Sequence, residues 1–326
     1  MPDNKEIVII GPSKVGKTAL VASLSHAAVT LNRRSNRNNQ PIEVIGKNTD
    51  TRDLFTKVYQ LLQTGSLPFA GTHSIINYHI EMTSPAPAPS FMQRLKILFS
   101  GMTDPKPEVC NIYFPDAPGG AVFHGDDDEA DEITIRNLRN ELIRKISSAF
   151  GLIICLDAAI LNPTVDTNDQ KRAALNFAKW LPGLLSEVLE RQEANSTGRL
   201  NIKRVCIVMT KADLWAKNNN YTDLAETTVQ NRNGYDHAID ILGKAFFMGL
   251  RQFFDTNTEF NFFMSSVFGF YQGGLQESFM EEANEETVTS LDEWTPFNVI
   301  EPFLTAVDAT PPNTFVITKQ KFDIGV

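Results

Sequence analysis

The stretch GPSKVGKT, residues 11–18, decides how this chain folds. The apolar run 7–10 comes directly before it, and the helix-forming run 19–24 comes directly after it. A strand, the pattern G-x-x-x-x-G-K-T and a helix, in that order, predict a phosphate-binding loop. The glycines allow a tight turn whose backbone N–H groups can face phosphate oxygens, and the helix adds the positive end of its dipole.

Two side chains of this loop have specific expected roles. Lys17 is expected to reach the β- and γ-phosphates as a catalytic residue, and the Thr18 hydroxyl is expected to bind Mg²⁺. The alternative, a chance glycine-lysine turn, does not account for the strand and helix on either side. The loop residues expected to bind the ligand are Gly11, Ser13, Lys14, Val15, Gly16, Lys17 and Thr18.

Size and charge restrict the possible functions. With 326 residues, of which 42% are hydrophobic and 21% charged, the chain can bury a core of useful size. We expect one domain over 1–326, with insertions at 33–71, 84–107 and 268–296. The net charge of −9 and the pI of about 5.1 disfavour binding to nucleic acid or to an anionic membrane.

The cysteines and the N-terminal residues indicate a reducing compartment. Cys110, Cys155 and Cys206 each lie in an apolar, strand-like run and are expected in the core, without metal-site spacing. Residues 1–6 lack the basic and apolar parts of a signal peptide, and no apolar run approaches the ~18 residues of a membrane span. We therefore expect a cytoplasmic protein.

Apolar strands alternate with amphipathic helices, which predicts an α/β fold with a mostly parallel sheet and helices on both faces. Residues 73–82 instead alternate between apolar and polar side chains, which suggests an antiparallel edge strand with one wet face. The other strands are expected at 7–10, 108–114, 152–156, 202–209 and 259–264. Helices are expected at 17–31, 52–63, 133–150, 169–191, 237–254 and 297–307.

The segment FMQRLKILF, residues 91–99, combines apolar and basic side chains between proline-rich stretches. Such a segment could touch a membrane or a partner helix. Packing on its own domain is the alternative, and we favour it because the segment is short.

A second motif, DAPG, occupies residues 116–119 at the end of an apolar strand. Asp116 can bind Mg²⁺ through water, and the Gly119 N–H can face the γ-phosphate. An ordinary turn is the alternative, since D-x-x-G is a weak pattern by itself. Its place after a strand, downstream of the phosphate-binding loop, favours the nucleotide site.

A third motif, TKAD, occupies residues 210–213, again directly after a buried strand. The Asp213 carboxylate can accept two hydrogen bonds from the ring N–H and the amine of guanine, which adenine cannot supply. The stem of Lys211 can lie over the flat base, and Thr210 completes the binding segment. The alternative for Asp213 is a helix cap.

A fourth, weaker signal is the run of small residues at the end of the last strong strand. Small side chains there let the backbone approach a base closely. The residues concerned are Ser265, Ser266 and Val267.

Together these motifs resemble those of the Ras-like, translation-factor-related P-loop GTPase superfamily, over residues 5–308. The resemblance implies a P-loop NTPase fold and a guanine-nucleotide switch that binds GTP or GDP with Mg²⁺. It also implies a first-switch threonine that contacts Mg²⁺ and the γ-phosphate. Thr72 is the best-placed candidate for this metal-binding and catalytic role, ahead of Thr64 and Thr51, and an ordinary loop threonine is its alternative.

The chain departs from the family pattern in two places. Thr210 stands where the family usually has asparagine, and it can keep one hydrogen bond to the phosphate-binding loop. Gly120, after D-x-x-G, has no side chain to orient an attacking water, as a glutamine does in Ras. His124 and Arg52 are candidate substitutes, with an exposed histidine and a salt-bridged helix residue as the respective alternatives.

The expected function is a GTP-binding molecular switch that slowly hydrolyses GTP to GDP and phosphate. Its switch loops are expected to rearrange and to bind a protein partner or activator. The acidic segment 126–132 could attract a basic partner, and a solvated, mobile loop is the favoured alternative. One alternative is a GTP-binding interaction module without useful turnover, which Gly120 favours. The other is an ATP-using P-loop enzyme, which residues 210–213 disfavour.

Overall fold

The structure is a computed structural model. It describes residues 5–12, 14–34, 41–64, 76–84, 108–116, 132–161, 167–192, 198–219, 230–267, 269–271, 274–275 and 296–307. Several predictions lie outside these residues: those for Ser13, Thr72, Gly119, Gly120 and His124, the segment 91–99, all but the last residue of the segment 126–132, and most of the insertions 84–107 and 268–296.

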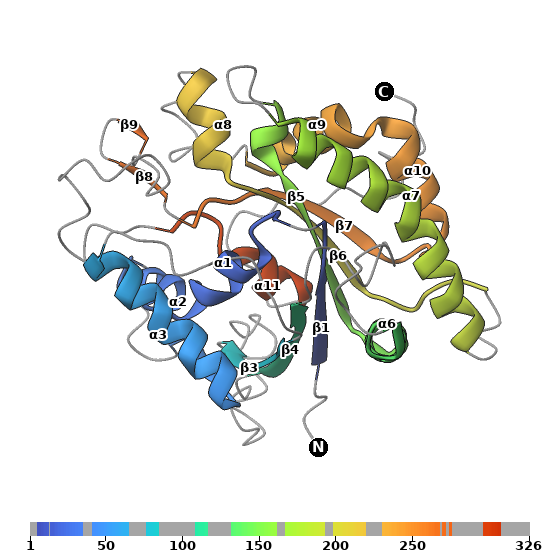
Figure 1. Ribbon diagram of the computed structural model, residues 1–326, viewed down its shortest axis with the longest axis horizontal. Helices are drawn as coiled ribbons and strands as arrows, with labels where there is room; N and C mark the ends of the chain where they lie inside the picture. Colours follow the sequence, from blue (N-terminus) through green and yellow to red (C-terminus); the bar gives the residue numbers. More distant parts are fainter. Residues whose placement is uncertain are drawn as a thin grey trace, which may run out of the picture.

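A seven-stranded sheet forms the centre of the molecule, in the order β2-β3-β4-β1-β5-β6-β7 (Figure 1). Strands β4, β1, β5, β6 and β7 pair in parallel, whereas β3 runs antiparallel to β2 and β4. The predicted α/β class with a mostly parallel sheet is confirmed. The strands are β1 Lys5–Ile10, β2 Glu43–Gly46, β3 Ile76–Ser84, β4 Glu108–Asp116, β5 Gly151–Asp157, β6 Arg204–Thr210 and β7 Glu259–Met264. A small hairpin pairs β8 Phe270–Tyr271 with β9 Gly274–Leu275.

The antiparallel strand β3 lies one place in from the edge of the sheet. The short strand β2 pairs with it, from Glu43 opposite Thr83 to Gly46 opposite Ile80, and takes the edge position that was expected for residues 73–82. The antiparallel direction and the wet face are confirmed, since His79 is exposed between buried neighbours. Alternation of side chains reports a solvated face of a strand and does not report whether another strand lies beside it.

Helices cover both faces of the sheet, as predicted (Figure 1). Helices α1, α2, α3 and α11 pack on one face, and α6, α7, α9 and α10 pack on the other. The helices are α1 Lys17–Ala22, α2 Leu24–Arg34, α3 Thr49–Thr64, α6 Glu132–Ser148, α7 Asn168–Arg191, α8 Ala212–Asn219, α9 Gln230–Leu242, α10 Lys244–Gln252 and α11 Glu301–Ala306, with a 3-10 turn, η2, at Ala158–Leu161. None of the helices within the described ranges is both long and apolar enough to cross a bilayer.

The central strands are apolar along their whole length because both sides of each strand are buried. In β5, Ile153 and Cys155 contact the helices of one face, whereas Leu152 and Leu156 contact those of the other. A parallel sheet with helices on both faces leaves no wet side for polar residues. The three cysteines are buried and not disulfide-bonded, as expected of core residues.

Two of the predicted helices are each divided in two. The helix expected at 17–31 is α1 followed by α2. Ser23, which lies between them, still donates its N–H to the Ala19 carbonyl, one turn earlier, over 3.1 Å. The helix expected at 237–254 is α9 and α10, which Gly243 separates by its left-handed φ of 80°. The glycine ends α9 because its backbone leaves the helical region at no steric cost.

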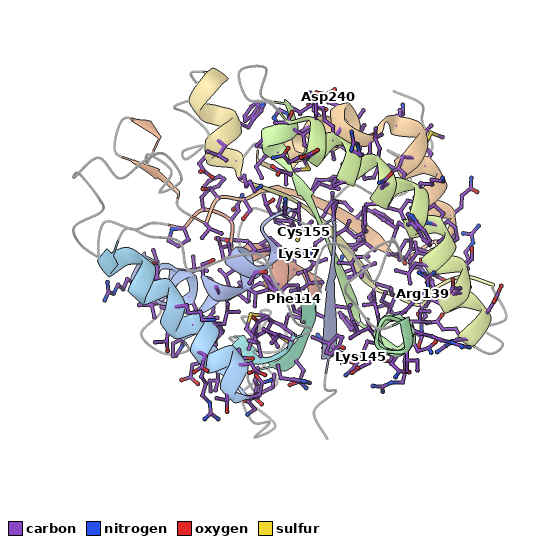
Figure 2. All side chains as sticks on the ribbon, viewed as in Figure 1. Lys17, Phe114, Arg139, Lys145, Cys155 and Asp240 are labelled. Atoms are coloured by element: carbon purple, nitrogen blue, oxygen red, sulfur yellow. The ribbon has the colours of Figure 1, made fainter. Side chains whose placement is uncertain are left out.

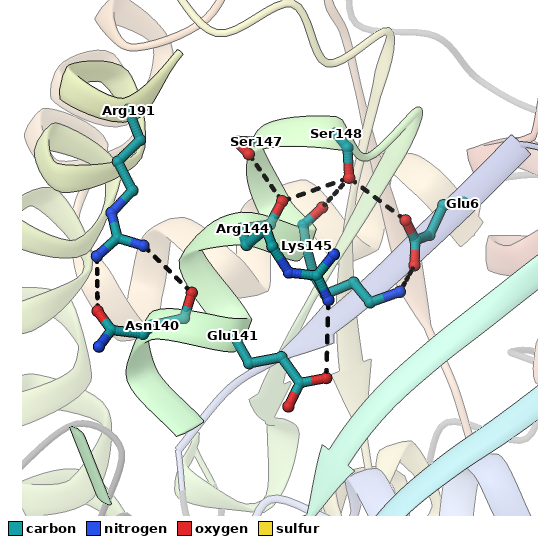
Figure 3. Close-up of polar contacts among 8 residues, drawn as sticks. All are labelled: Glu6, Asn140, Glu141, Arg144, Lys145, Ser147, Ser148 and Arg191. Carbon is teal, nitrogen blue, oxygen red and sulfur yellow. Dashed lines mark hydrogen bonds and ion pairs between the residues drawn. The ribbon is translucent and has the colours of Figure 1, made fainter. Parts of the chain in front are cut away.

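Polar side chains fasten α6 to the start of β1 and to α7 (Figure 3). Lys145 of α6 forms an ion pair with Glu6 of β1, and Arg191 of α7 donates to Asn140 Oδ1 over 2.6 Å. Because α6 connects β4 to β5, these contacts stabilise the crossover that places the two strands on opposite sides of β1.

That crossover creates a topological switch point at β1. From β1 the chain passes to β2, β3 and β4 on one side, and after α6 it continues with β5 on the other. Open α/β sheets bind ligands outside the carboxyl ends of their strands at such a point. The loop 11–16 follows β1 directly, so the predicted phosphate-binding loop lies at the expected place.

Candidate nucleotide site

The loop after β1 has the backbone geometry of a tight cradle. Gly11 passes so close to β5 that a Cβ there would lie 2.6 Å from the Cys155 carbonyl oxygen. Gly16 precedes α1 with a left-handed φ of 92°, and the Leu20 N–H bonds its carbonyl over 2.9 Å. Both glycines are therefore required, one by space and the other by backbone conformation.

Lys17 folds back over the loop that precedes it. Its Nζ donates to the Gly11 carbonyl over 3.0 Å and to the Pro12 carbonyl over 2.6 Å. The Lys17 ammonium lies near Cys155 in β5 (Figure 2). Its charge lowers the pKa of the Cys155 thiol, but burial has the larger effect and raises that pKa to about 12. The ammonium therefore supplies a local positive charge at the cradle of an otherwise acidic protein.

Thr210, at the end of β6, joins the loop to the sheet. Its hydroxyl lies within hydrogen-bond distance of the Val15 carbonyl in the loop and of the Leu156 carbonyl in β5, the latter at 3.0 Å. The predicted hydrogen bond from Thr210 to the phosphate-binding loop is thus present. A hydroxyl has one proton, so it can donate fully to only one of these two carbonyls at a time.

Lys211 crosses from β6 to the same loop. Its backbone has a left-handed φ of 57°, and its Nζ donates to the Lys14 carbonyl over 2.9 Å. The same Nζ forms an ion pair with Asp157 Oδ2 at 2.6 Å. Lys14 also has a left-handed φ, of 59°. The hydrogen bond therefore links two residues whose backbone conformation is rare for residues other than glycine.

Asp213 lies in the first turn of α8 with only 4% of its surface exposed. The Ser266 hydroxyl donates to its Oδ1 over 2.6 Å and itself accepts the Gly269 N–H at 2.9 Å. Burial raises the pKa of Asp213, although the Ser266 bond and the Lys211 charge oppose the shift. Further hydrogen bonds would stabilise this carboxylate, because a buried charge is costly without them.

Ser265 connects the third and fourth motifs through its backbone. Its N–H bonds the Met209 carbonyl over 2.7 Å, and its carbonyl accepts the Ala212 N–H over 3.0 Å. Its own hydroxyl is buried and has no hydrogen-bond partner among the described residues. Val267, which follows Ser266, is half-buried against the core.

Two of the three predicted Mg²⁺ ligands come from neighbouring segments, and the third, Thr72, lies outside the described residues. Thr18 lies in the first turn of α1, and Asp116 ends β4, which pairs with β1 up to Val8 opposite Tyr113. A hydroxyl and a carboxylate are the oxygen donors that Mg²⁺ prefers, so these residue types fit the ion. Within the described ranges no cluster of three or more His, Cys, Asp or Glu could hold a metal, and the Asp116 side chain is not among the described groups.

Two secondary candidates have structural contacts. Thr51, buried at the start of α3, hydrogen-bonds Asn48 and accepts the His79 N–H of β3 over 3.0 Å. The exposed Arg52 donates to the Gly46 carbonyl of the edge strand over 3.2 Å, and among the described residues no salt bridge of Arg52 is found. Thr51 therefore ties α3 to the sheet, and its contacts explain why it is poorly placed as a switch residue.

Asp157 also belongs to this site, although no motif in the sequence points to it. It ends β5, is 4% exposed, and pairs with Lys211. The available signal was a carboxylate directly after an otherwise apolar strand, the same position that Asp116 has after β4.

No family model matches the chain, and no curated protein matches it.

The solved structures to which this chain is similar include a GTP-bound receptor complex and a GTPase-like domain. The signal recognition particle receptor SRb-GTP/SRX complex from Chaetomium thermophilum is 18% identical, with a TM-score of 0.37, over 82% of this chain and 93% of that chain. The S. cerevisiae Ski7 GTPase-like domain is 12% identical over 82% of this chain and 43% of its own. Its TM-score is 0.36 with GTP bound and 0.35 with GDP and inorganic phosphate. All three likenesses are distant, so fold and site rest on this chain's own contacts.

Proposed function

We propose that this chain is a guanine-nucleotide-binding switch that binds GTP and GDP with Mg²⁺. One observation carries the proposal. Hydrogen bonds at the carboxyl ends of the strands link three stretches that lie far apart in the sequence: 11–18, 210–213 and 265–266. The links are Thr210 to Val15, Lys211 to Lys14, and Ser266 to Asp213. These links support one site in which the proposed phosphate cradle and the proposed base-reading carboxylate act together.

Base selection is assigned to Asp213. Its buried carboxylate is an acceptor only, so it pairs with the two adjacent N–H donors of guanine. Adenine presents an acceptor at the matching ring nitrogen and would leave a buried charge unpaired, which costs about 1–3 kcal/mol or more. The stem of Lys211, which the contacts to Lys14 and Asp157 hold in place, is assigned to the face of the base.

Phosphate binding is assigned to the loop 11–16 and to Lys17, whose ammonium is already at the cradle. Thr18 and Asp116 would hold Mg²⁺, which on binding neutralises charge on the phosphates. Thr72 and Gly119 are proposed to contact the γ-phosphate and thereby to report its loss. Such loops are where a protein partner would distinguish the two nucleotide states.

Hydrolysis is proposed to be slow in the isolated protein. Gly120 has no side chain with which to hold an attacking water, so an activating partner would have to supply that side chain. Measuring phosphate release over many turnovers separates the readings: slow release supports a GTPase, and none despite tight binding supports an interaction module.

The test of the proposed function is calorimetric titration with GTP, GDP and ATP, with Mg²⁺ and with EDTA. Asp213→Ala is expected to weaken GTP and GDP binding at least about tenfold, because it removes a buried charged hydrogen-bond acceptor. Asp240→Ala, an exposed carboxylate on α9, is the matched control and should bind like the parent (Figure 2). Equal binding of ATP and GTP by the parent would refute the base assignment.

A further inference from the structure

We propose that Asp157 is a positioning residue for the guanine nucleotide and that it acts through Lys211. The inference rests on the proposed function, because it assigns a role within the same site. It adds a residue that neither the phosphate-binding loop nor the base-reading motif contains.

The geometry of Asp157 fits a fixed anchor. It ends β5 at the switch point and is 4% exposed. One carboxylate oxygen accepts the Ala159 N–H over 2.9 Å, and the other lies 2.6 Å from Lys211 Nζ. The backbone bond determines the orientation of the carboxylate, so the place where it holds the ammonium is determined as well.

The other end of the contact explains what the anchor positions. Lys211 Nζ also donates to the Lys14 carbonyl, and a Cβ placed on Gly16 would lie 3.8 Å from Lys211 Cε. The lysine stem therefore runs beside the phosphate-binding loop between two fixed points. A side chain with four rotatable bonds would otherwise lose considerable conformational entropy on covering a base.

Electrostatics makes the pairing with Asp157 strongly favoured. Burial raises the pKa of Asp157, and Lys211 opposes that shift by charge and by hydrogen bond. A buried carboxylate is costly unless a cation lies beside it, so the ammonium is held where the carboxylate is. Charge on the ligand is not required for this arrangement, and the stem is pre-organised before the nucleotide binds.

The effect should be the same for GDP and GTP. Asp157 and Lys211 contact the loop and, under the proposed function, the base, whereas the γ-phosphate belongs to other residues. Asp157→Asn, which keeps the shape and removes the charge, is expected to raise the dissociation constants of both nucleotides about tenfold. Their ratio should stay unchanged.

A double-mutant cycle tests the proposal by calorimetry with GDP and GTP on four proteins: the parent, Asp157→Asn, Lys211→Met and the double variant. Lys211→Met keeps the stem and removes the charge, so it tests the same link from the other end and is expected to weaken binding to a similar extent. If Asp157 acts through Lys211, the double variant binds within about twofold of Lys211→Met alone. A residue that only stabilised the fold would weaken binding again in that background. Asp240→Asn controls for loss of an acidic side chain.

The outcomes are distinguishable. Parental affinity in Asp157→Asn or in Lys211→Met, or multiplying effects in the double variant, would overturn the role of Asp157 while leaving the proposed function intact. Failure of the parent to bind either nucleotide would overturn the proposed function itself.

Discussion

The Ser266 hydroxyl donates to Asp213 Oδ1 over 2.6 Å, which joins the ends of two neighbouring strands at the proposed base site. Through this bond the segment that follows β7 fixes the orientation of a carboxylate in the first turn of α8, the helix that follows β6.

Asp213→Asn should reverse base preference. Asparagine presents one acceptor and one donor, which matches the ring N–H and the carbonyl that xanthine has where guanine has an amine. We expect xanthosine triphosphate to bind at least about tenfold more tightly than GTP, the reverse of the parent. Competition between the two triphosphates on both proteins measures this. Continued preference for GTP would contradict the assignment.

The same substitution should stabilise the nucleotide-free protein in a pH-dependent way. The pKa of Asp213 is raised above its ordinary 3.8 by burial, so the folded state binds this proton more tightly than the unfolded state. The contribution of Asp213 to the free energy of unfolding therefore increases as the pH falls from neutral toward 3.8. It is lowest at pH values above the pKa that Asp213 has in the folded protein. Thermal melts should show Asp213→Asn more stable than the parent at neutral pH, with the gap closing in acid. A gap that widens in acid would contradict the prediction.

Thr210→Asn should tighten nucleotide binding. The single hydroxyl proton of Thr210 serves two carbonyls, of Val15 and Leu156. The nearby Ser265 hydroxyl has no hydrogen-bond partner within the part of the chain that the structure describes. An asparagine amide has two N–H donors and an oxygen that can accept from Ser265. We expect GDP to bind about tenfold more tightly, because two further hydrogen bonds, of about 0.5–1.5 kcal/mol each, hold the phosphate-binding loop in its binding geometry before the nucleotide arrives.

Thr210→Val is the matched control for that experiment, since it keeps the shape and removes the hydroxyl. It leaves buried carbonyls without their donor and should lower the free energy of unfolding by about 1–3 kcal/mol. Weaker GDP binding by Thr210→Asn than by the parent would show that the asparagine cannot be accommodated there.

Gly11→Ala should disrupt the loop. A Cβ at this position would lie 2.6 Å from the Cys155 carbonyl oxygen, so the loop must move away from β5. We expect at least about tenfold weaker nucleotide binding, since loop N–H groups misplaced by ångströms lose their hydrogen bonds. Gly183→Ala is the control: it lies exposed in α7 with nothing within 4 Å, and should stabilise the helix by about 0.5–1 kcal/mol. Unchanged binding by Gly11→Ala would contradict the proposed cradle.

The sequence predicted the parts of the fold where pattern and burial agree. Strand β7, expected at 259–264, has those bounds, because both of its faces are buried and its neighbours are polar. The four-residue strand β2 was missed because its burial is mixed and it has no apolar run. The division of α9 from α10 was missed because helical periodicity continues on both sides of Gly243.

At the site, sequence spacing identified the segments but not their contacts. Thr210 bonds the loop as expected, since that bond needs only a donor at the end of β6. The pairing of Asp157 with Lys211 joins residues 54 positions apart and depends on the parallel register of β5 and β6. Such a contact follows from the order of strands in the sheet, which no local pattern encodes.

The most direct test of the central claim is competition for the unmodified protein between fluorescently labelled GDP and unlabelled GTP, GDP or ATP, with Mg²⁺ present. The account predicts that GTP and GDP displace the label at similar concentrations and that ATP requires at least about a hundredfold more. Displacement by ATP as readily as by GTP, or no binding of labelled GDP, would contradict it.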